Sequence, residues 1–156
     1  MVDNLIFRAV NSKLTGELAA IIKLLKEDEL GSARENSAKE IDPSYMSAFR
    51  AITSDANQNL MVVEQNGEII GTCHLTIMPS LTLIGTTRMN IEAVRIAENF
   101  RGQKIGEWMI ERAIEFGKSK KVGLVQLTTN IKRLRTKSFY EKLGFQATHV
   151  GMKLKI

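Results

Sequence analysis

The sequence predicts one mixed α/β domain, residues 1–156, built around a central sheet with helices packed against it. Apolar residues recur at helical spacing in some segments and alternate in others. The dipeptide Asn66-Gly67 joins two β-rich segments, which indicates an antiparallel hairpin. Later segments alternate strand and helix, as in a βαβ unit. The expected order is therefore β, α, α, β, β, β, α, β, α, β.

The expected strands share alternating or β-branched apolar residues. They cover Leu5–Val10, Leu60–Gln65, Glu68–Met78, Arg88–Ala97, Val122–Thr129 and Gln146–Ile156. Simple alternation along the fourth of these puts Ile91, Ala93 and Arg95 on one face. The other face then carries Asn90, Glu92, Val94 and Ile96.

Four segments predict helices. The first, residues 14–30, carries one apolar face of Leu18, Ile21, Ile22 and Leu25. The second begins with Asp42 as N-cap and Pro43 as first helical residue. The third runs from near Gln103 to near Gly117, and the fourth lies within residues 133–145, where Gly144 supplies a left-handed C-terminal residue.

Composition and charge favour a protein of a reducing compartment. The single cysteine, Cys73, has no disulfide partner, and we expect neither a secretory leader nor a membrane span, hence a cytoplasmic location. The net charge of +5 is uneven: residues 101–156 hold 13 Lys and Arg against four Glu, which gives +9 there and −4 for residues 1–100. Such a segment suits nucleic acid, an acidic membrane surface or a phosphorylated small molecule, and composition does not choose among them.

The stretch Glu98–Ile110, ENFRGQKIGEWMI, predicts a turn followed by a helix N-terminus. Free N–H groups and the helix dipole make such a place favourable for an anion. Gly102 removes a side chain where phosphate oxygens would approach, and Gly106 allows close packing of the first turn. The pattern is neither a Walker A loop nor the G-x-G-x-x-G of dinucleotide sites, and ordinary strand-to-helix turns also contain Arg and Gly.

The combination of VRIAENFRGQKIG with SFYEKLGF about thirty residues later resembles the GCN5-related N-acetyltransferase (GNAT) family. The resemblance covers nearly the whole element order. It implies a mixed sheet of about six or seven strands with a splayed fourth strand, about four flanking helices, and acetyl-coenzyme A (acetyl-CoA) as cosubstrate. The segment around SFYEKLGF is also similar to the aminoalkylphosphonate acetyltransferase branch.

The resemblance implies a coenzyme site along the fourth strand and the following turn. Residues assigned to it are Val94, Arg95, Ile96, Arg101, Gly102, Gln103, Lys104, Ile105, Gly106 and Arg133. Two positions depart from the family pattern. Lys104 stands where the family has a middle glycine, and Arg133 stands where many members have asparagine, so a coenzyme contact of Arg133 would be ionic or absent.

Acetyl transfer to an amine needs a neutral amine and a protonated leaving thiol. With an amine pKa of about 10.4, making it neutral at pH 7 costs roughly 4.6 kcal/mol. Glu92, on the face predicted for Val94 and Ile96, is the candidate base, although a pKa of about 4.3 requires burial or a relaying water. A pairing of Glu92 with Arg88 or another cation is the structural alternative. By the resemblance, Tyr140 matches the family tyrosine that lies near the coenzyme sulfur and is usually assigned as general acid, and a core role is its alternative.

Other reactive side chains favour structural interpretations. Cys73 is expected to be a buried thiol, with adjacent His74 on the opposite strand face. The two histidines, His74 and His149, lack the spacing of a metal site, so we expect no metal. Arg88 and Arg95 are candidates for an anionic acceptor group, and exposed strand charge explains them equally well.

The resulting hypothesis is an N-acetyltransferase acting on a primary amine of a small molecule. A catalytically inactive acyl-CoA-binding regulator, a protein N-acetyltransferase and a basic nucleic-acid-binding module are the alternatives, and we expect no nucleic-acid or membrane partner. In this fold the acceptor pocket would form between the early helices and the loop 79–87. An exposed C-terminal strand would allow a homodimer.

Overall fold

A computed structural model of the chain describes residues 4–27, 29–32, 35 and 40–156. The strands are β1 (Leu5–Ala9), β2 (Gln58–Gln65), β3 (Glu68–Met78), β4 (Arg88–Ile96) and β5 (Leu124–Leu127). The helices are α1 (Thr15–Lys26), α2 (Glu29–Ser32), α3 (Pro43–Ser54), α4 (Thr82–Gly85), the 3₁₀ turn η1 (Glu98–Phe100), α5 (Ile105–Ser119) and α6 (Leu134–Lys142).

The five strands form one mixed sheet in the order β1-β2-β3-β4-β5. The first four pair antiparallel, whereas β4 and β5 pair parallel, with α5 as the crossover between them. The mixed α/β class, the antiparallel first part and the βαβ second part are therefore confirmed.

The last expected strand does not form. Residues 146–156 contain neither strand nor helix, and the apolar side chains Val150, Met152, Leu154 and Ile156 are each at least 88% exposed. A strand is stable only where a neighbour offers backbone partners and a face to bury, and β5 pairs with β4 along just four residues. Within the described residues the sheet thus has five strands, fewer than the six or seven expected.

The hairpin and the cap of α3 form as the local sequence predicts. Asn66 and Gly67 both have positive φ, 51° and 84°, as a type I′ turn requires. Asp42 accepts a hydrogen bond from the Ser44 N–H at 2.8 Å, and Pro43 occupies the first helical position. Each of these two signals acts within a few neighbouring residues, which is why a short pattern predicts it.

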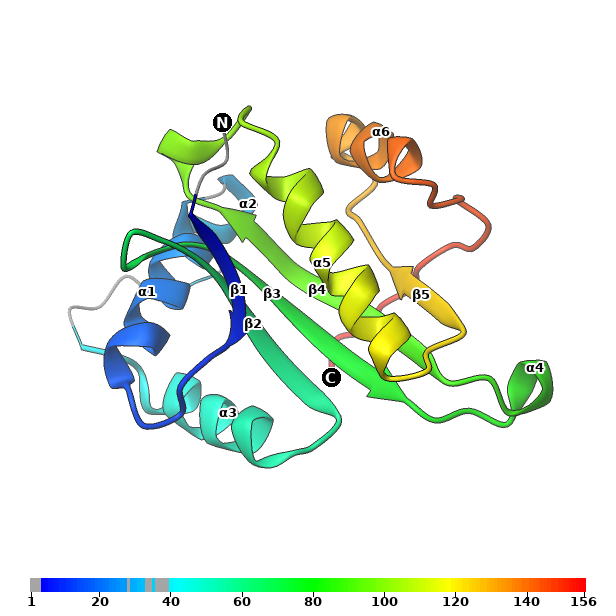
Figure 1. The fold of residues 1–156 in the computed structure, drawn as a ribbon, viewed down its shortest axis with the longest axis horizontal. Coiled ribbons are helices and arrows are strands. Elements are labelled where there is room, and N and C mark those ends of the chain that lie inside the picture. Colours follow the sequence, from blue (N-terminus) through cyan, green and yellow to red (C-terminus); the bar gives the residue numbers. More distant parts are fainter. Residues whose placement is uncertain (1–3, 28, 33–34, 36–39) are drawn as a thin grey trace.

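The sheet separates two apolar clusters. α5 and α6 cover one face, as Figure 1 shows, and Met109, Ile110 and Ala113 of α5 pack there against Leu75 and Ile91. The other face carries the cluster between the sheet, α1 and α3, which includes Leu18, Ile21, Ile22, Phe49, Leu60 and Val62. The predicted inner face of the first helix is thereby confirmed. No described helix combines the length and apolar character needed to cross a bilayer.

Candidate functional site

The edge of β4 that faces β5 is only partly used. The β4–β5 ladder runs from Arg88–Leu124 to Ile91–Leu127, while β4 itself continues to Ile96. Figure 1 shows β4 extending past β5 toward the turn that leads into α5. We call the β4 backbone from Glu92 to Ile96 on the side away from β3 the open edge. This parting of the strands confirms the splayed fourth strand.

The open edge presents the backbone groups of two particular residues. The Ala97 N–H donates to the Ile70 carbonyl at 2.8 Å, so the backbone of Ala97 faces β3. Because neighbouring residues of a strand direct their amides to opposite sides, the amides of Val94 and Ile96 face away from β3. An extended ligand that carries its own amide groups can pair with them as an added strand does.

A bulge in β4 overturns the face predicted for Glu92. Ala93 has φ 52°, and the register with β3 shifts between Thr72 and His74, so two β4 residues oppose one β3 residue. Val94 and Ile96 therefore pack against the cluster under α5, whereas Glu92 pairs with His74. The prediction that Glu92 shares a face with Val94 and Ile96 is wrong, because strict alternation does not continue through a bulge.

The turn before α5 has the backbone of an anion site. Gly102 has φ 78° and Lys104 has φ 63°, and α5 starts directly after them at Ile105. No side chain from the described parts of the protein caps this helix N-terminus. Its first N–H groups thus point outward with the positive end of the helix dipole, which suits a diphosphate or a similar anion.

The side chain of Arg101 serves the turn itself. Its Nε donates to the Ile96 carbonyl at 3.0 Å and its Nη2 donates to the Glu27 carbonyl at 3.3 Å. The Glu98 N–H also donates to a carboxylate oxygen of Glu27, at 2.9 Å. These bonds fasten the end of β4 and the turn to the end of α1. With these contacts, Arg101 adds positive charge near the turn and positions its backbone N–H groups.

Gly106 lies where α5 approaches both β4 and α6. A Cβ built on Gly106 would lie 3.6 Å from the Phe139 ring and 3.9 Å from a side-chain carbon of Ile96. These are ordinary van der Waals distances, so a methyl group would fit at this position. That Gly106 allows close packing of the first turn therefore stays a prediction.

Tyr140 of α6 lies on the sheet face that α5 covers, in the same cluster against which Val94 and Ile96 pack. The residue is 7% exposed and packs edge to face with Phe139 and Phe145, at centroid distances of 5.0 and 5.6 Å. Burial, with a smaller effect of Cys73, raises the pKa of Tyr140 to about 12, and Arg95 and Arg133 act in the opposite direction. The phenol is therefore a protonated hydrogen-bond donor at neutral pH.

Cys73 is a fully buried thiol on β3. It lies opposite the β4 bulge, and burial raises its pKa to about 12. A thiol in that state is a poor nucleophile. The expectation of a structural cysteine is confirmed.

The two arginines assigned to the coenzyme have backbone contacts near the site. Arg95 donates through Nη1 to the Val94 carbonyl at 2.7 Å, which occupies one acceptor of the open edge. Arg133 precedes α6, and its N–H donates to the Asn130 carbonyl at 2.9 Å. Both guanidinium groups lie close enough to act on the pKa of Tyr140. Their positive charge favours the ionised phenol, but the effect of burial on the pKa is larger.

His74 is a site residue that sequence reasoning missed. Its ring lies on the sheet face opposite Tyr140, and Nδ1 is 3.5 Å from a carboxylate oxygen of Glu92. The sequence correctly separated His74 from Cys73, but the pairing with Glu92 depends on a cross-strand register that no local pattern contains. By contrast, His149 is exposed and contacts the Thr148 hydroxyl. Among the described residues, no three His, Cys, Asp or Glu side chains come together as metal ligands would.

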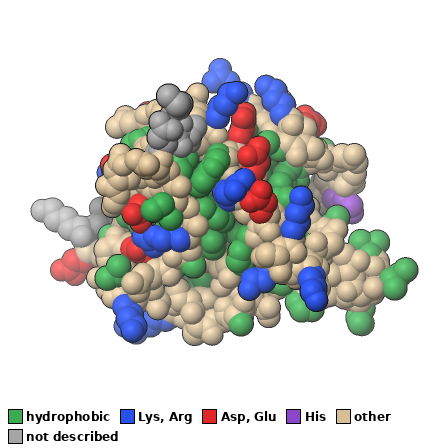
Figure 2. Space-filling model, viewed as in Figure 1, with side chains coloured by type: hydrophobic (Ala, Val, Ile, Leu, Met, Phe, Trp, Pro, Cys, Tyr) green, Lys and Arg blue, Asp and Glu red, His purple; other side chains and the backbone are tan. Residues whose placement is uncertain are grey.

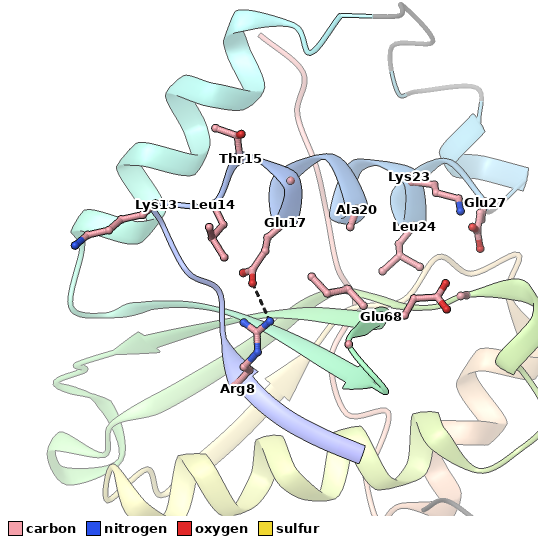
Figure 3. Close-up of a pocket in the computed structure, with 14 residues that line it drawn as sticks. Arg8, Lys13, Leu14, Thr15, Glu17, Ala20, Lys23, Leu24, Glu27 and Glu68 are labelled. Atoms are coloured by element: carbon pink, nitrogen blue, oxygen red, sulfur yellow. Dashed lines mark hydrogen bonds and ion pairs between the residues drawn. The ribbon is translucent and has the colours of Figure 1, made fainter. Parts of the chain in front are cut away.

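A pocket of about 590 Å³ lies at another place, between α1 and the β2–β3 turn. Figure 3 shows the Arg8–Glu17 ion pair in this pocket. Charged side chains lie at both ends of the part of α1 that lines it. Its lining includes α1 but no residue of the loop 79–87 and none of the assigned catalytic residues. Of the two parts expected to form the acceptor pocket, the early helices line this pocket through α1, and the loop 79–87 does not.

Fold and site together define an α/β domain that can hold an extended, anionic ligand along a strand edge and a helix N-terminus. Comparison with known proteins then places it. A sequence model of the acetyltransferase (GNAT) family matches residues 16–145. The chain therefore belongs to this family.

Individual relatives agree with that assignment. Over 93 residues the chain is 34% identical to a glucosamine 6-phosphate N-acetyltransferase of Trypanosoma brucei brucei, a match covering 60% of this chain and 61% of that enzyme. Over 109 residues it is 29% identical to an aminoalkylphosphonate N-acetyltransferase of Salmonella typhimurium, covering 68% of each. A crystal structure described as a transcriptional regulator from Bacillus halodurans C-125 superposes with a TM-score of 0.93 at 37% identity, covering 98% of this chain and 100% of that one.

Proposed function

We propose that the protein transfers the acetyl group of acetyl-CoA to a primary amine of a small molecule. The observation that carries this proposal is the direct connection of the open edge of β4 to the uncapped N-terminus of α5. The amides of Val94 and Ile96 suit the amide groups of the pantetheine arm. The N–H groups after Gly102 suit the pyrophosphate.

The chain supplies groups for both halves of the transfer. Glu92 lies where β4 leaves β5, so its carboxylate can receive a proton from the amine near the thioester. Tyr140 lies on the other side of the sheet as a neutral phenol, so it can donate a hydrogen bond to the sulfur as the carbon–sulfur bond breaks. The amine would then attack from one face of the sheet while the thiol leaves toward the other.

The two curated relatives suggest a class of acceptor. Both are named for amines that also carry a phosphate or phosphonate group. Arg88 is on the same β4 face as Glu92, since the bulge comes after both, and its Nη1 donates to the Gln126 side chain at 3.4 Å. Its Nε is buried without a partner among the described residues. We therefore propose an amine with an anionic group that Arg88 attracts.

Amine-dependent thiol release from acetyl-CoA tests the proposal. The panel contains 2-aminoethylphosphonate, glucosamine 6-phosphate, glucosamine without phosphate, spermidine and lysine. Turnover that is fastest with the phosphorylated or phosphonylated amines, and that Arg88→Gln weakens through KM, supports both the activity and the acceptor class. Turnover with spermidine or lysine alone would contradict the acceptor class and leave the activity standing.

A regulator that binds acyl-CoA without transfer is the second candidate, because the Bacillus halodurans structure carries a regulator's description. Calorimetry with acetyl-CoA distinguishes the two. Micromolar binding with no thiol release across the panel would favour the regulator. No binding would contradict both candidates.

A further inference from the structure

His74 and Glu92 form a cross-strand pair where β4 leaves β5. They face each other in the β3–β4 register, one residue beyond the last β4–β5 pair at Ile91. The His74 side chain is 14% exposed and that of Glu92 is 56% exposed, with Nδ1 and Oε1 3.5 Å apart. The carboxylate is thus open to solvent while the ring lies behind it.

Neighbouring side chains determine which ring nitrogen carries the proton. The Oε1 atom of Gln58 lies 2.7 Å from Nε2 of His74 and also accepts a hydrogen bond from the Thr76 hydroxyl at 3.0 Å. With the Gln58 amide in this orientation its carbonyl oxygen accepts from both neighbours, so Nε2 is the donor. The lone pair of the neutral ring is therefore on Nδ1, which is the atom directed at Glu92.

This arrangement has room for one more proton. An ionised carboxylate and an unprotonated Nδ1 both accept, so a proton placed between them joins the two groups. The charged group that acts on His74 is Glu92 of β4, while Gln58 of β2 contacts the ring through a neutral amide that Thr76 of β3 also hydrogen-bonds. Burial lowers the pKa of His74, and the nearby carboxylate partly opposes this effect. The ring is accordingly neutral and ready to accept at pH 7.

We propose that His74, in place of the Glu92 carboxylate itself, is the proton acceptor for the substrate ammonium and that Glu92 orients and stabilises the imidazolium that forms. The proposal rests on the proposed acetyl transfer. It narrows the mismatch noted for Glu92 acting alone, because the ordinary pKa of an imidazole, about 6.5, is nearer to that of an amine than the ordinary carboxylate pKa of about 4.3, and burial of His74 offsets part of this gain. The exposed carboxylate draws the ammonium in, and the proton passes to Nδ1.

The protons and bonds balance. The ammonium loses its first proton to His74, and the neutral amine attacks the acetyl carbonyl. The carbon–nitrogen bond forms and the carbon–sulfur bond breaks. The nitrogen loses a second proton, the leaving thiolate takes up one proton, and His74 returns the other to solvent. The products are the amide, the free thiol and one proton.

Nuclear magnetic resonance tests the pair without relying on turnover. The chain has only two histidines, so His149→Gln leaves the ring signals of His74 alone. We expect the nitrogen shifts of a neutral Nε2–H ring at pH 8 and a pKa below the ordinary value. Glu92→Gln should lower that pKa further, because it removes the carboxylate that raises it. An Nδ1–H ring, or a pKa unchanged by Glu92→Gln, would overturn the pairing.

Kinetics test the catalytic role. With the acceptor that turns over fastest in the panel, His74→Gln should lower kcat about 100-fold at pH 7, as expected for loss of a general base. The KM for acetyl-CoA should stay the same, and the deficit should narrow toward pH 9.5, where more of the amine is already neutral. His149→Gln, the matched control at an exposed position, should keep wild-type kinetics.

The variants separate this proposal from the proposed function. If the unsubstituted protein gives no thiol release with any amine, acetyl transfer fails and this role of His74 fails with it. If the protein turns over and His74→Gln keeps its kcat and its pH profile, only the role of His74 is overturned. Glu92→Gln keeps the proposal testable if His74→Gln misfolds, because the Glu92 side chain is more than half exposed and its substitution should not disturb the fold. We expect it to show a smaller loss with the same pH trend.

Discussion

At the scale of single residues, Tyr140 is held as a neutral phenol by its surroundings. Tyr140→Phe keeps the ring contacts with Phe139 and Phe145 and removes only the hydroxyl. A hydrogen bond to a charged group contributes about 1.5–3 kcal/mol, so kcat should fall roughly 10- to 100-fold. Acetyl-CoA affinity, measured by calorimetry, should change little. An unchanged kcat would remove Tyr140 from the chemistry.

Cys73 should be inert in the folded protein. Its thiol is fully buried and its pKa is raised to about 12, so at pH 8 the thiolate is scarce and unreachable. Ellman's reagent should detect almost no thiol in the native protein and one per chain after unfolding in guanidinium. Rapid native labelling would contradict the burial of this residue. If Cys73 did react rapidly, its thiol would add to the signal of every thiol-release assay, and a cysteine-free variant would be needed.

Single residues were predictable where one short pattern determines them. Asp42, Pro43, Asn66 and Gly67 act within a few neighbouring residues, and each does what its type predicts. The face of Glu92 was not predictable in this way. A left-handed residue at Ala93 is needed to shift the register, and alanine carries no signal for that conformation.

At the scale of elements, the turn into α5 explains how Lys104 replaces the glycine of the family pattern. Lys104 has the left-handed backbone, φ 63° and ψ 8°, that a glycine adopts freely. The departure therefore changes the side chain and its conformational cost while the turn keeps its shape. The sequence showed the departure, and the structure shows why the site tolerates it.

Relief of that cost is measurable. Lys104→Gly should raise stability by about 0.5–1 kcal/mol, because a left-handed backbone is costly for residues with a Cβ. Thermal unfolding should show a Tm about 1–4 °C higher. Lys104→Ala is the matched control, since it removes the same charge but keeps the Cβ and should give no gain. An equal rise in both variants would attribute the effect to charge.

Elements that depend on distant partners were harder to predict. Residues 146–156 alternate as a strand should, yet they form no strand, since the four residues of β5 offer only a short edge for pairing. The crossover helix α5 was predictable, since its apolar face lies within one continuous segment. The splay of β4 from β5 came from the family resemblance and not from periodicity.

At the scale of the whole molecule, an ion-pair network joins β1, α1 and β2. Arg8 contacts Glu17 at 2.8 Å and Glu64 at 2.7 Å, and the Asn11 N–H donates to Glu17 at 2.7 Å. Burial alone would raise the pKa of Glu17, but the hydrogen bonds from Arg8 and Asn11 outweigh it and leave the pKa below its ordinary value of 4.5. Folding and ionisation of Glu17 are therefore linked.

The sign of that linkage gives a prediction. Because the folded pKa is depressed, the stabilisation is present above about pH 4.5 and is lost as the pH falls through the folded pKa. Urea unfolding between pH 7 and pH 3.5 should show a loss of stability that is smaller in Glu17→Gln, which starts from lower stability. Glu68→Gln, an exposed acidic residue of the same pocket, should keep the wild-type slope. Parallel slopes in all three proteins would contradict the linkage.

Charge over the whole molecule bears on partners. Figure 2 shows Lys and Arg side chains interspersed with Asp and Glu on the face that carries α5. The single-domain organisation, the homodimer, the cytoplasmic location and the expected lack of nucleic-acid and membrane partners stay predictions. A protein with net charge +5 still attracts phosphorylated small molecules, which agrees with the proposed acceptor class.

The most direct test of the central claim is a titration of the ¹⁵N-labelled protein with CoA, followed through its backbone amide signals. If the open edge and the turn before α5 hold the coenzyme, the largest shifts should fall on Val94, Ile96 and residues 102–106. Shifts gathered instead on Gly16, Ala20 and Ile69, in the pocket beside α1, would contradict the claim and place the ligand elsewhere.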